Sequence, residues 1–137
     1  MIQLIVGPKG KGKTKKLLDK ANEEIKIVQG NIVYVDKSVK HMYELNNRIR
    51  LIDMSKYSLK NSDEFIGFIL GVLSQDHDLQ QMYLDSFLKV AKLEEKDITE
   101  TLERLEEIGT AYDVLFVLSI SLEKEALPEN AKTKVIE

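Results

Sequence analysis

The sequence predicts a three-layer α/β protein with a mainly parallel sheet of about five strands, and three observations support this fold class. Short apolar runs alternate along the chain with segments whose apolar residues recur at helical spacing. The runs are apolar almost throughout, which is typical of parallel strands buried on both faces. A glycine-rich segment joins the first run to the first helical segment, and the chain contains no repeat, low-complexity tract or linker. We therefore expect residues 1–137 to form one domain.

The first half of the chain alternates strands and helices. We expect strands at residues 3–6, 31–36 and 49–53, a helix between the glycine-rich segment and Gly30, and a short helical stretch at residues 39–47. The apolar face of the long helix consists of Leu18, Ala21, Ile25 and Val28. Gly30 is placed to end this helix, because glycine commonly follows the last helical residue.

In the middle of the chain, the sequence pattern predicts a helix and then a strand. Asn61, Ser62 and Asp63 offer side-chain oxygens that can cap the start of the helix. Its apolar face consists of Phe65, Ile66, Ile69, Val72 and Leu73. The strand covers residues 80–85 and ends at Asp85.

In the last third of the chain, the sequence pattern predicts a helix, a strand and a closing segment. Asp97 and Glu100 indicate a capping box at the start of the helix, and Gly109 can end it. Its apolar stripe consists of Ile98, Leu102, Leu105 and Ile108. The most continuously apolar strand follows at residues 114–121. The tail, residues 127–137, is expected to form a short helix with Pro128 in its first turn.

Composition narrows the class of protein. Hydrophobic residues make up 43% and charged residues 31% of the 137 residues, which is typical of a folded protein. The chain has no cysteine, so disulfides and thiolate zinc sites are excluded. No apolar stretch approaches the roughly 20 residues of a membrane helix, and the N-terminal run is too short for a signal peptide. A net charge of −3 does not indicate a nucleic-acid partner. Because no feature of the sequence indicates an oxidising compartment or a membrane, we expect a soluble, cytoplasmic protein.

The stretch GPKGKGKT, residues 7–14, matches the phosphate-binding loop pattern of glycine, four residues, glycine, lysine and serine or threonine. Glycines let backbone N–H groups approach phosphate oxygens, and the following helix adds its positive dipole end. Lys13 is expected to neutralise the β and γ phosphates, and the Thr14 hydroxyl to bind Mg²⁺. The residues expected to bind the nucleotide are Gly7, Pro8, Lys9, Gly10, Lys11, Gly12, Lys13, Thr14 and Lys15.

Lysines are concentrated at and after this loop, at positions 9, 11, 13, 15 and 16. Cations near a helix N-terminus are unfavourable, by about 0.3 to 1 kcal/mol each, unless an anion is bound there. A bound polyanion would reverse the sign of this effect. The alternative is that all but Lys13 simply face solvent and aid solubility.

Polar residues end the predicted strands at the edge where a parallel sheet binds its ligands. These residues are Gly7, Asp36, Asp53, Asp85 and Ser119. A triphosphate-binding protein needs a carboxylate at a nearby strand end to hold Mg²⁺, usually through water. From position alone, Asp36, Asp53 and Asp85 all remain candidates for this role.

The opening MIQLIVGPKGKGKTKKLL resembles that of the thymidine kinases and of the related RecA-like phosphate-loop NTPases. The order of later elements is also similar, and MYLDSF falls where those kinases carry an apolar run followed by Asp-Glu. The resemblance implies that Asp85 holds the metal and that the nucleotide is ATP. The chain also looks like small ATP-binding proteins of Gram-positive bacteria, some of them labelled as twitching-motility ATPases of the PilT type.

The sequence departs from these families at important positions. Ser86 stands where the kinases have the glutamate that acts as a base, and the cysteine-bound zinc module is missing. Thymidine kinase activity is therefore not expected, and the further motifs of a PilT motor are not found. Asp36 or Asp53 could act as the catalytic carboxylate instead, or could simply cap the following turn. Ser119 could sense the γ-phosphate or bond only within its own loop.

The sequence thus predicts an ATP-binding protein that hydrolyses ATP slowly with Mg²⁺, with Lys13 and either Asp36 or Asp53 in catalytic roles and Thr14 and Asp85 on the metal. A protein partner or a second copy could complete the site by supplying an arginine. One alternative is a non-enzymatic ATP-dependent switch or assembly subunit. Another is a kinase acting on a small molecule or nucleoside. His41 and His77, the only histidines, lack the spacing of a helical zinc motif.

Overall fold

The computed structural model describes residues 1–137 and contains a five-stranded sheet. Its strands are β1 (Ile2–Val6), β2 (Asn31–Asp36), β3 (Arg50–Asp53), β4 (Leu79–Leu84) and β5 (Leu115–Ile120). Every neighbouring pair is parallel, and the strand order is β1-β5-β4-β2-β3. The predicted α/β class and the parallel sheet of about five strands are therefore confirmed.

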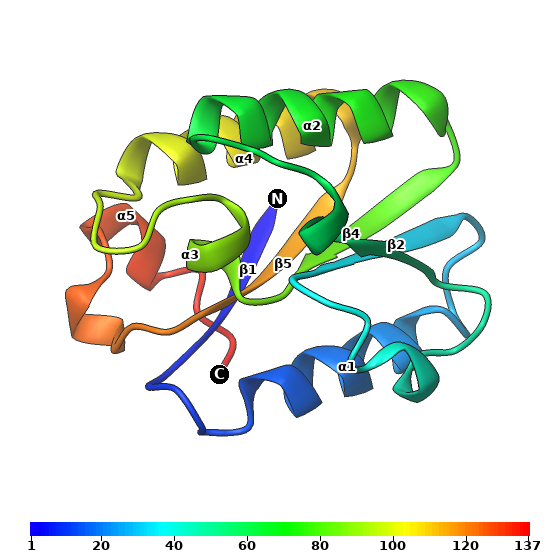
Figure 1. Ribbon diagram of the computed structural model, residues 1–137, viewed down its shortest axis with the longest axis horizontal. Helices are drawn as coiled ribbons and strands as arrows, with labels where there is room; N and C mark the ends of the chain where they lie inside the picture. The colour runs from blue at the N-terminus through cyan, green and yellow to red at the C-terminus, as the bar shows by residue number, and fades with distance from the viewer.

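Helices cover both faces of this sheet (Figure 1). They are α1 (Lys13–Glu24), α2 (Ser62–Gln75), α3 (Phe87–Val90), α4 (Thr99–Tyr112) and α5 (Glu129–Lys132). Short 3-10 helices are η1 (Met42–Glu44), η2 (Met54–Lys56) and η3 (Lys124–Ala126). In Figure 1, α1 lies below the sheet, and α2 and α4 lie above it. No helix combines the length and the apolar character needed to cross a membrane.

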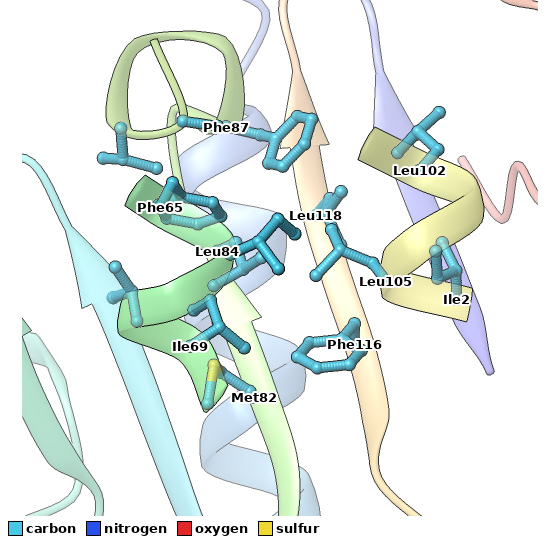
Figure 2. Close-up of a cluster of buried hydrophobic side chains, with 14 of the residues drawn as sticks. Ile2, Phe65, Ile69, Met82, Leu84, Phe87, Leu102, Leu105, Phe116 and Leu118 are labelled. Atoms are coloured by element: carbon cyan, nitrogen blue, oxygen red, sulfur yellow. The ribbon is translucent and has the colours of Figure 1, made fainter. Parts of the chain in front are cut away.

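The sheet separates two hydrophobic clusters of unequal size. The larger has 25 buried residues and lies between the sheet and α2, α3 and α4; Figure 2 shows Phe65, Leu84, Leu105, Phe116 and Leu118 within it. The smaller has 10 buried residues and joins α1 to the opposite face of the strands. Burial on both faces explains why the strand sequences are apolar almost throughout.

The predicted start of α2 is confirmed, and the predicted end of α1 is wrong. Asn61 is the N-cap of α2 and accepts a hydrogen bond from the Glu64 N–H at 2.9 Å, as its sequence position predicted. The prediction that α1 continues to Gly30 is wrong, because the helix ends at Glu24. The following Ile-Lys-Ile-Val stretch is rich in β-branched residues, which lower helix propensity. Gly30 instead lies tightly against the Asp78 backbone, where a side chain would collide.

The predicted start of α4 is also wrong in detail. Asp97 accepts hydrogen bonds from both the N–H and the hydroxyl of Thr99, at 2.9 and 2.7 Å. This local turn makes Ile98 the N-cap residue, without a side-chain cap, so the expected capping box with Glu100 does not form. Gly109 does not end the helix either, since α4 continues to Tyr112.

Two segments expected to be helical are mostly extended or irregular. Residues 39–47 contain only the single turn η1. In the tail, helix α5 has four residues, and Pro128 lies at its N-cap. The chain then runs beside β1, with backbone hydrogen bonds from Leu4 N–H to Lys134 O, from Ile136 N–H to Leu4 O and from Val6 N–H to Glu137 O, at 3.0, 2.8 and 3.0 Å. The tail thus pairs its backbone N–H and C=O groups with those on the free edge of β1. A longer helix in the tail could not reach these backbone groups of β1.

Candidate functional site

The loop between β1 and α1 has the backbone conformation that its glycines permit. Gly7, Gly10 and Gly12 have φ angles of 144°, 82° and 76°, in the region that residues with a side chain rarely adopt. Gly12 is the N-cap of α1 and provides no side-chain cap. The Gly7 N–H donates to Leu122 O at 2.9 Å, which ties the start of the loop to the segment after β5.

The backbone N–H groups of residues 9–15 have no acceptor within the protein. Gly7 precedes this series and is bonded, and Lys16 follows it and donates to Gly12 O at 3.2 Å. The first turn of a helix always leaves such donors unpaired, but here the series extends back through the loop. Consecutive free N–H groups next to a helix N-terminus form a binding place for an anion.

Lys13 lies within the loop rather than in solvent. Only 8% of it is exposed, and its Nζ donates to Pro8 O at 2.9 Å. Desolvation lowers the pKa of the Lys13 ammonium, the nearby Asp85 raises it in part, and Lys9 lowers it further. A buried ammonium held beside free amide donors is placed to neutralise an anion in the same loop.

Asp85 follows β4 and accepts hydrogen bonds on both carboxylate oxygens. Thr14 Oγ1 approaches Oδ1 at 3.3 Å, although the two residues are 71 positions apart in the sequence. Ser119 Oγ and the Ser86 N–H also donate to Oδ1, at 2.6 and 2.9 Å, and the Tyr34 hydroxyl donates to Oδ2 at 2.8 Å. Asp85 is only 2% exposed, so these donors compensate for its burial.

Asp36 ends β2 beside Asp85. The Asp85 N–H donates to Val35 O at 2.9 Å, which fixes the two strand ends side by side. Asp36 is 2% exposed; its Oδ1 accepts from the Lys37 N–H at 2.7 Å, and its Oδ2 is buried without a partner. Burial raises the pKa of the Asp36 carboxyl, and the charge of Asp85 raises it further. Two neighbouring carboxylates thus have different environments at one edge of the sheet.

A cavity of about 870 Å³ lies along the loop. Its lining includes Lys9, Gly10, Gly12, Lys13 and Thr14 from the loop and Asp85, Ser86 and Ser119 from the strand ends. Lys37, Lys89, Glu94 and Glu95 add further charged groups. The volume lies in the range of cavities that hold ligands the size of a nucleotide.

The structure separates Asp53 from this cavity. Asp53 lies at the end of the edge strand β3 and lines a different cavity of about 830 Å³. Its Oδ1 accepts from the Ser55 N–H and hydroxyl at 3.0 and 2.7 Å, which caps the turn η2 and lowers the pKa of Asp53. This is the capping role that the sequence had left open as the alternative to catalysis.

The other predicted residues occupy distinct places. Ser119 is buried and bonds to Asp85 on the neighbouring strand rather than only within its own loop. Lys15 and Lys16 are exposed and pair with Asp19 and Glu137, each at 3.2 Å. His41 bonds through Nδ1 to Glu44 Oε2 at 2.6 Å.

Thr14 and Asp85 fit the requirements of a magnesium ion. Mg²⁺ prefers oxygen ligands, keeps several waters and is commonly bound through one or two protein groups together with substrate phosphates. A hydroxyl and a carboxylate lie 3.3 Å apart here, next to the free amides of the loop. No group of three or more histidine, aspartate or glutamate side chains gathers around one metal position.

Tyr34 is a contributor to the site that the sequence analysis did not identify. It lies within the buried strand β2, where a tyrosine pattern indicates packing as readily as hydrogen bonding. Glu94 and Glu95, which the sequence analysis also did not place at the site, lie in the segment between α3 and α4 and line the cavity. Comparison with known proteins gives no matching family model and no matching curated protein.

Proposed function

We propose that the protein binds ATP with Mg²⁺ in the cavity along residues 7–14 and hydrolyses it slowly. The observation that carries this proposal is the run of free backbone N–H groups at residues 9–15, together with the buried ammonium of Lys13. These donors suit the oxygens of a polyphosphate, and the cations at Lys9 and Lys37 line the same cavity. The choice of adenine rests on the resemblance of the loop sequence to ATP-binding families.

Bound Mg²⁺ would supply charge neutralisation at the β and γ phosphates. The chain's own groups then have separate tasks. Thr14 and Asp85 hold the metal, Lys13 and the loop amides orient the phosphates, and Ser119 fixes the Asp85 carboxylate. In hydrolysis, a water oxygen bonds to the γ-phosphorus, the bond to the β-phosphate oxygen breaks, and the water proton leaves to an acceptor.

Asp36 is the group best suited to accept that proton or to orient the water. Its raised pKa makes it a better base than an exposed aspartate, and its Oδ2 has no other partner. Because Asp36 is only 2% exposed, water reaches it only when the surrounding segment opens. Slow turnover follows from this burial and from the serine at position 86.

Equilibrium dialysis against MgATP tests the binding step. Lys13→Ala should raise the dissociation constant about 10- to 100-fold, because hydrogen bonds to charged groups contribute about 1.5–3 kcal/mol. Lys26→Ala is the matched control, since it removes the same charge beyond the far end of α1, where Lys26 is exposed beside Glu23. Equal binding by wild type and Lys13→Ala would refute the proposed phosphate site.

A switch that binds ATP without turning it over is the second candidate. The burial of Asp36 and the lack of a glutamate after Asp85 favour it. Phosphate release separates the two: an ATPase releases phosphate continuously, whereas a switch changes its oligomeric state or partner with ATP and releases none. Size measurements by light scattering with ATP, with ADP and without nucleotide are therefore made on the same samples. An unchanged size in all three would count against the switch.

A further inference from the structure

Tyr34 donates the one hydrogen bond that reaches the second oxygen of the Asp85 carboxylate. Its hydroxyl lies 2.8 Å from Asp85 Oδ2, and its side chain is fully buried on β2. The other oxygen, Oδ1, is approached by Ser119 Oγ, by the Ser86 N–H and by Thr14 Oγ1, at 2.6, 2.9 and 3.3 Å. Donors from the protein therefore hold both oxygens of this carboxylate.

This arrangement restricts how Asp85 can bind a cation. A carboxylate offers about four lone-pair positions, of which Tyr34 takes one on Oδ2 while three donors approach Oδ1. A cation that binds both oxygens at once therefore competes with donors on each of them, with Tyr34 at Oδ2 and with three donors at Oδ1. A cation that binds through Oδ1 alone, or through a water, leaves the Tyr34 bond intact and competes first with the longest contact, that of Thr14.

Magnesium and calcium ions differ in this respect. Mg²⁺ takes octahedral geometry, keeps several waters and commonly binds one carboxylate oxygen. Ca²⁺ takes about six to eight oxygens and readily binds both oxygens of one carboxylate. We propose that Tyr34 is a positioning residue whose hydrogen bond to Oδ2 disfavours binding of a cation through both oxygens of Asp85, so that the site prefers Mg²⁺ to Ca²⁺. This inference rests on the proposed nucleotide site and adds the origin of its cation specificity.

A pair of tyrosine variants isolates the hydroxyl of Tyr34. Tyr34→Phe removes one oxygen and keeps the ring, which stacks on Tyr83 with centroids 6.2 Å apart. Tyr83→Phe is the matched control, because Tyr83 is equally buried on the neighbouring strand but donates to Gln81 Oε1 at 2.7 Å. Both variants lose one buried hydroxyl, and only Tyr34→Phe removes a donor from Asp85. Thermal melts without nucleotide establish that both are folded.

The measurement is the dissociation constant for ATP in the presence of Mg²⁺ and, separately, of Ca²⁺. For Tyr34→Phe we expect binding with Mg²⁺ to weaken about 10-fold, as when an outer partner of a metal ligand is removed. Binding with Ca²⁺ should stay the same or improve, so the preference for Mg²⁺ falls about 10-fold. Tyr83→Phe should keep the wild-type preference. The proposal is overturned if Tyr34→Phe also keeps the wild-type preference for Mg²⁺ over Ca²⁺. It is likewise overturned if Tyr83→Phe loses this preference to the same extent as Tyr34→Phe.

Ser119→Ala provides a second variant that does not depend on the folding of Tyr34→Phe. It removes a donor from Oδ1 and leaves Tyr34 on Oδ2, so affinity with both cations should fall together and the preference should persist. A changed preference in Ser119→Ala would overturn the specific role of Tyr34. A wild-type protein that binds ATP with neither cation would instead overturn the nucleotide site itself, so the two failures are distinguishable.

Discussion

Asp36 and Asp85 end neighbouring strands, and their hydrogen bonding differs sharply. Donors surround both oxygens of Asp85, whereas Asp36 leaves its Oδ2 buried without a partner. A buried carboxylate oxygen that lacks a hydrogen bond costs stability. Such local costs are common where a group is kept for function rather than for folding. Asp36 is therefore the residue at which stability and activity should respond in opposite directions to substitution.

Asp36→Asn should stabilise the protein near neutral pH and abolish its turnover. Folding favours protonated Asp36, because its pKa in the folded protein lies above the ordinary value of 3.8. The free energy of unfolding therefore falls as pH rises through the window between the two pKa values. Removing the charge should raise the melting temperature near pH 7, and the gain should shrink as pH falls toward about 4. Melts followed by circular dichroism measure this, and phosphate release measures turnover.

Asp53→Asn is the control for this experiment, since it removes the same charge at the end of the next strand. The hydrogen bonds from Ser55 lower the pKa of Asp53, so its ionised form stabilises the folded protein above the ordinary pKa. This variant should gain no stability near pH 7 and should retain turnover. An Asp36→Asn protein that is no more stable than wild type near pH 7, or that keeps full turnover, would contradict the role given to Asp36.

The sequence predicted the residues of the loop better than their partners. The glycine and lysine spacing fixed Lys13 and Thr14, because the motif lies in one short segment. It could not choose among three aspartates by position, since only the sheet order shows which of them faces the loop. The role of Tyr34 was missed because the sequence does not show whether a tyrosine within an apolar strand only packs in the core or also donates a hydrogen bond to a distant carboxylate.

At the scale of the elements, Gly109 shows how a helix can depend on a missing side chain. It lies within α4 rather than at its end. A Cβ at this position would lie 2.6 Å from the Met1 backbone nitrogen and 2.7 Å from Val114 O. The backbone at the start of β1 and before β5 therefore packs directly against this turn of the helix, and neither neighbour is a flexible side chain that could move away.

Gly109→Ala should destabilise the fold although alanine is the better helix former. The added methyl group meets backbone atoms, and overpacking of this kind costs about 1–3 kcal/mol. Gly67→Ala in α2 is the matched control, since no atom lies within 4 Å of its added Cβ, and it should stabilise the protein by about 0.5–1 kcal/mol. Urea denaturation of the three proteins measures both changes. A Gly109→Ala protein as stable as Gly67→Ala would show that the contact yields without cost.

Periodicity predicted elements well where they were long and buried. The five strands and the helices α1, α2 and α4 all occur where the apolar pattern indicated. The ends of the helices were less predictable. Asp97 forms a local turn with Thr99 in place of a capping box, and the β-branched residues after Glu24 lower the helix propensity there. The tail was misjudged because its extended course depends on the free edge of β1, which no local pattern reveals.

At the scale of the whole molecule, the order of the strands assembles the candidate site. Strand β5 lies between β1 and β4, so Ser119 at the end of β5 reaches Asp85 while the loop after β1 lies on the other side. Strand β2 lies beyond β4 and brings Tyr34 and Asp36 to the same carboxylate. The sequence implied that the ends of the strands share one edge of the sheet. The order of the strands depends on pairing between distant segments, so it could not be derived from the sequence.

The strand order also separates the two large cavities. The cavity along the loop adjoins the ends of β4 and β5, and the other lies along the edge strand β3, lined by residues such as Tyr43, Leu51 and Asp53. Both have a volume suited to a ligand. Only the first combines free backbone donors with a buried lysine and a carboxylate. The proposed function therefore depends on which of them receives the nucleotide.

Amide chemical shifts during a titration with MgATP test this most directly. The protein is labelled with ¹⁵N, and its backbone N–H signals are followed as MgATP is added, with Lys13→Ala as the control. We predict that the largest changes occur at residues 9–15 and at Ser86, because these N–H groups would gain or change acceptors when phosphate binds. Lys13→Ala should show little change at the same concentrations. Shifts concentrated around Tyr43 and Leu51, or no shifts at residues 9–15, would contradict the proposed site.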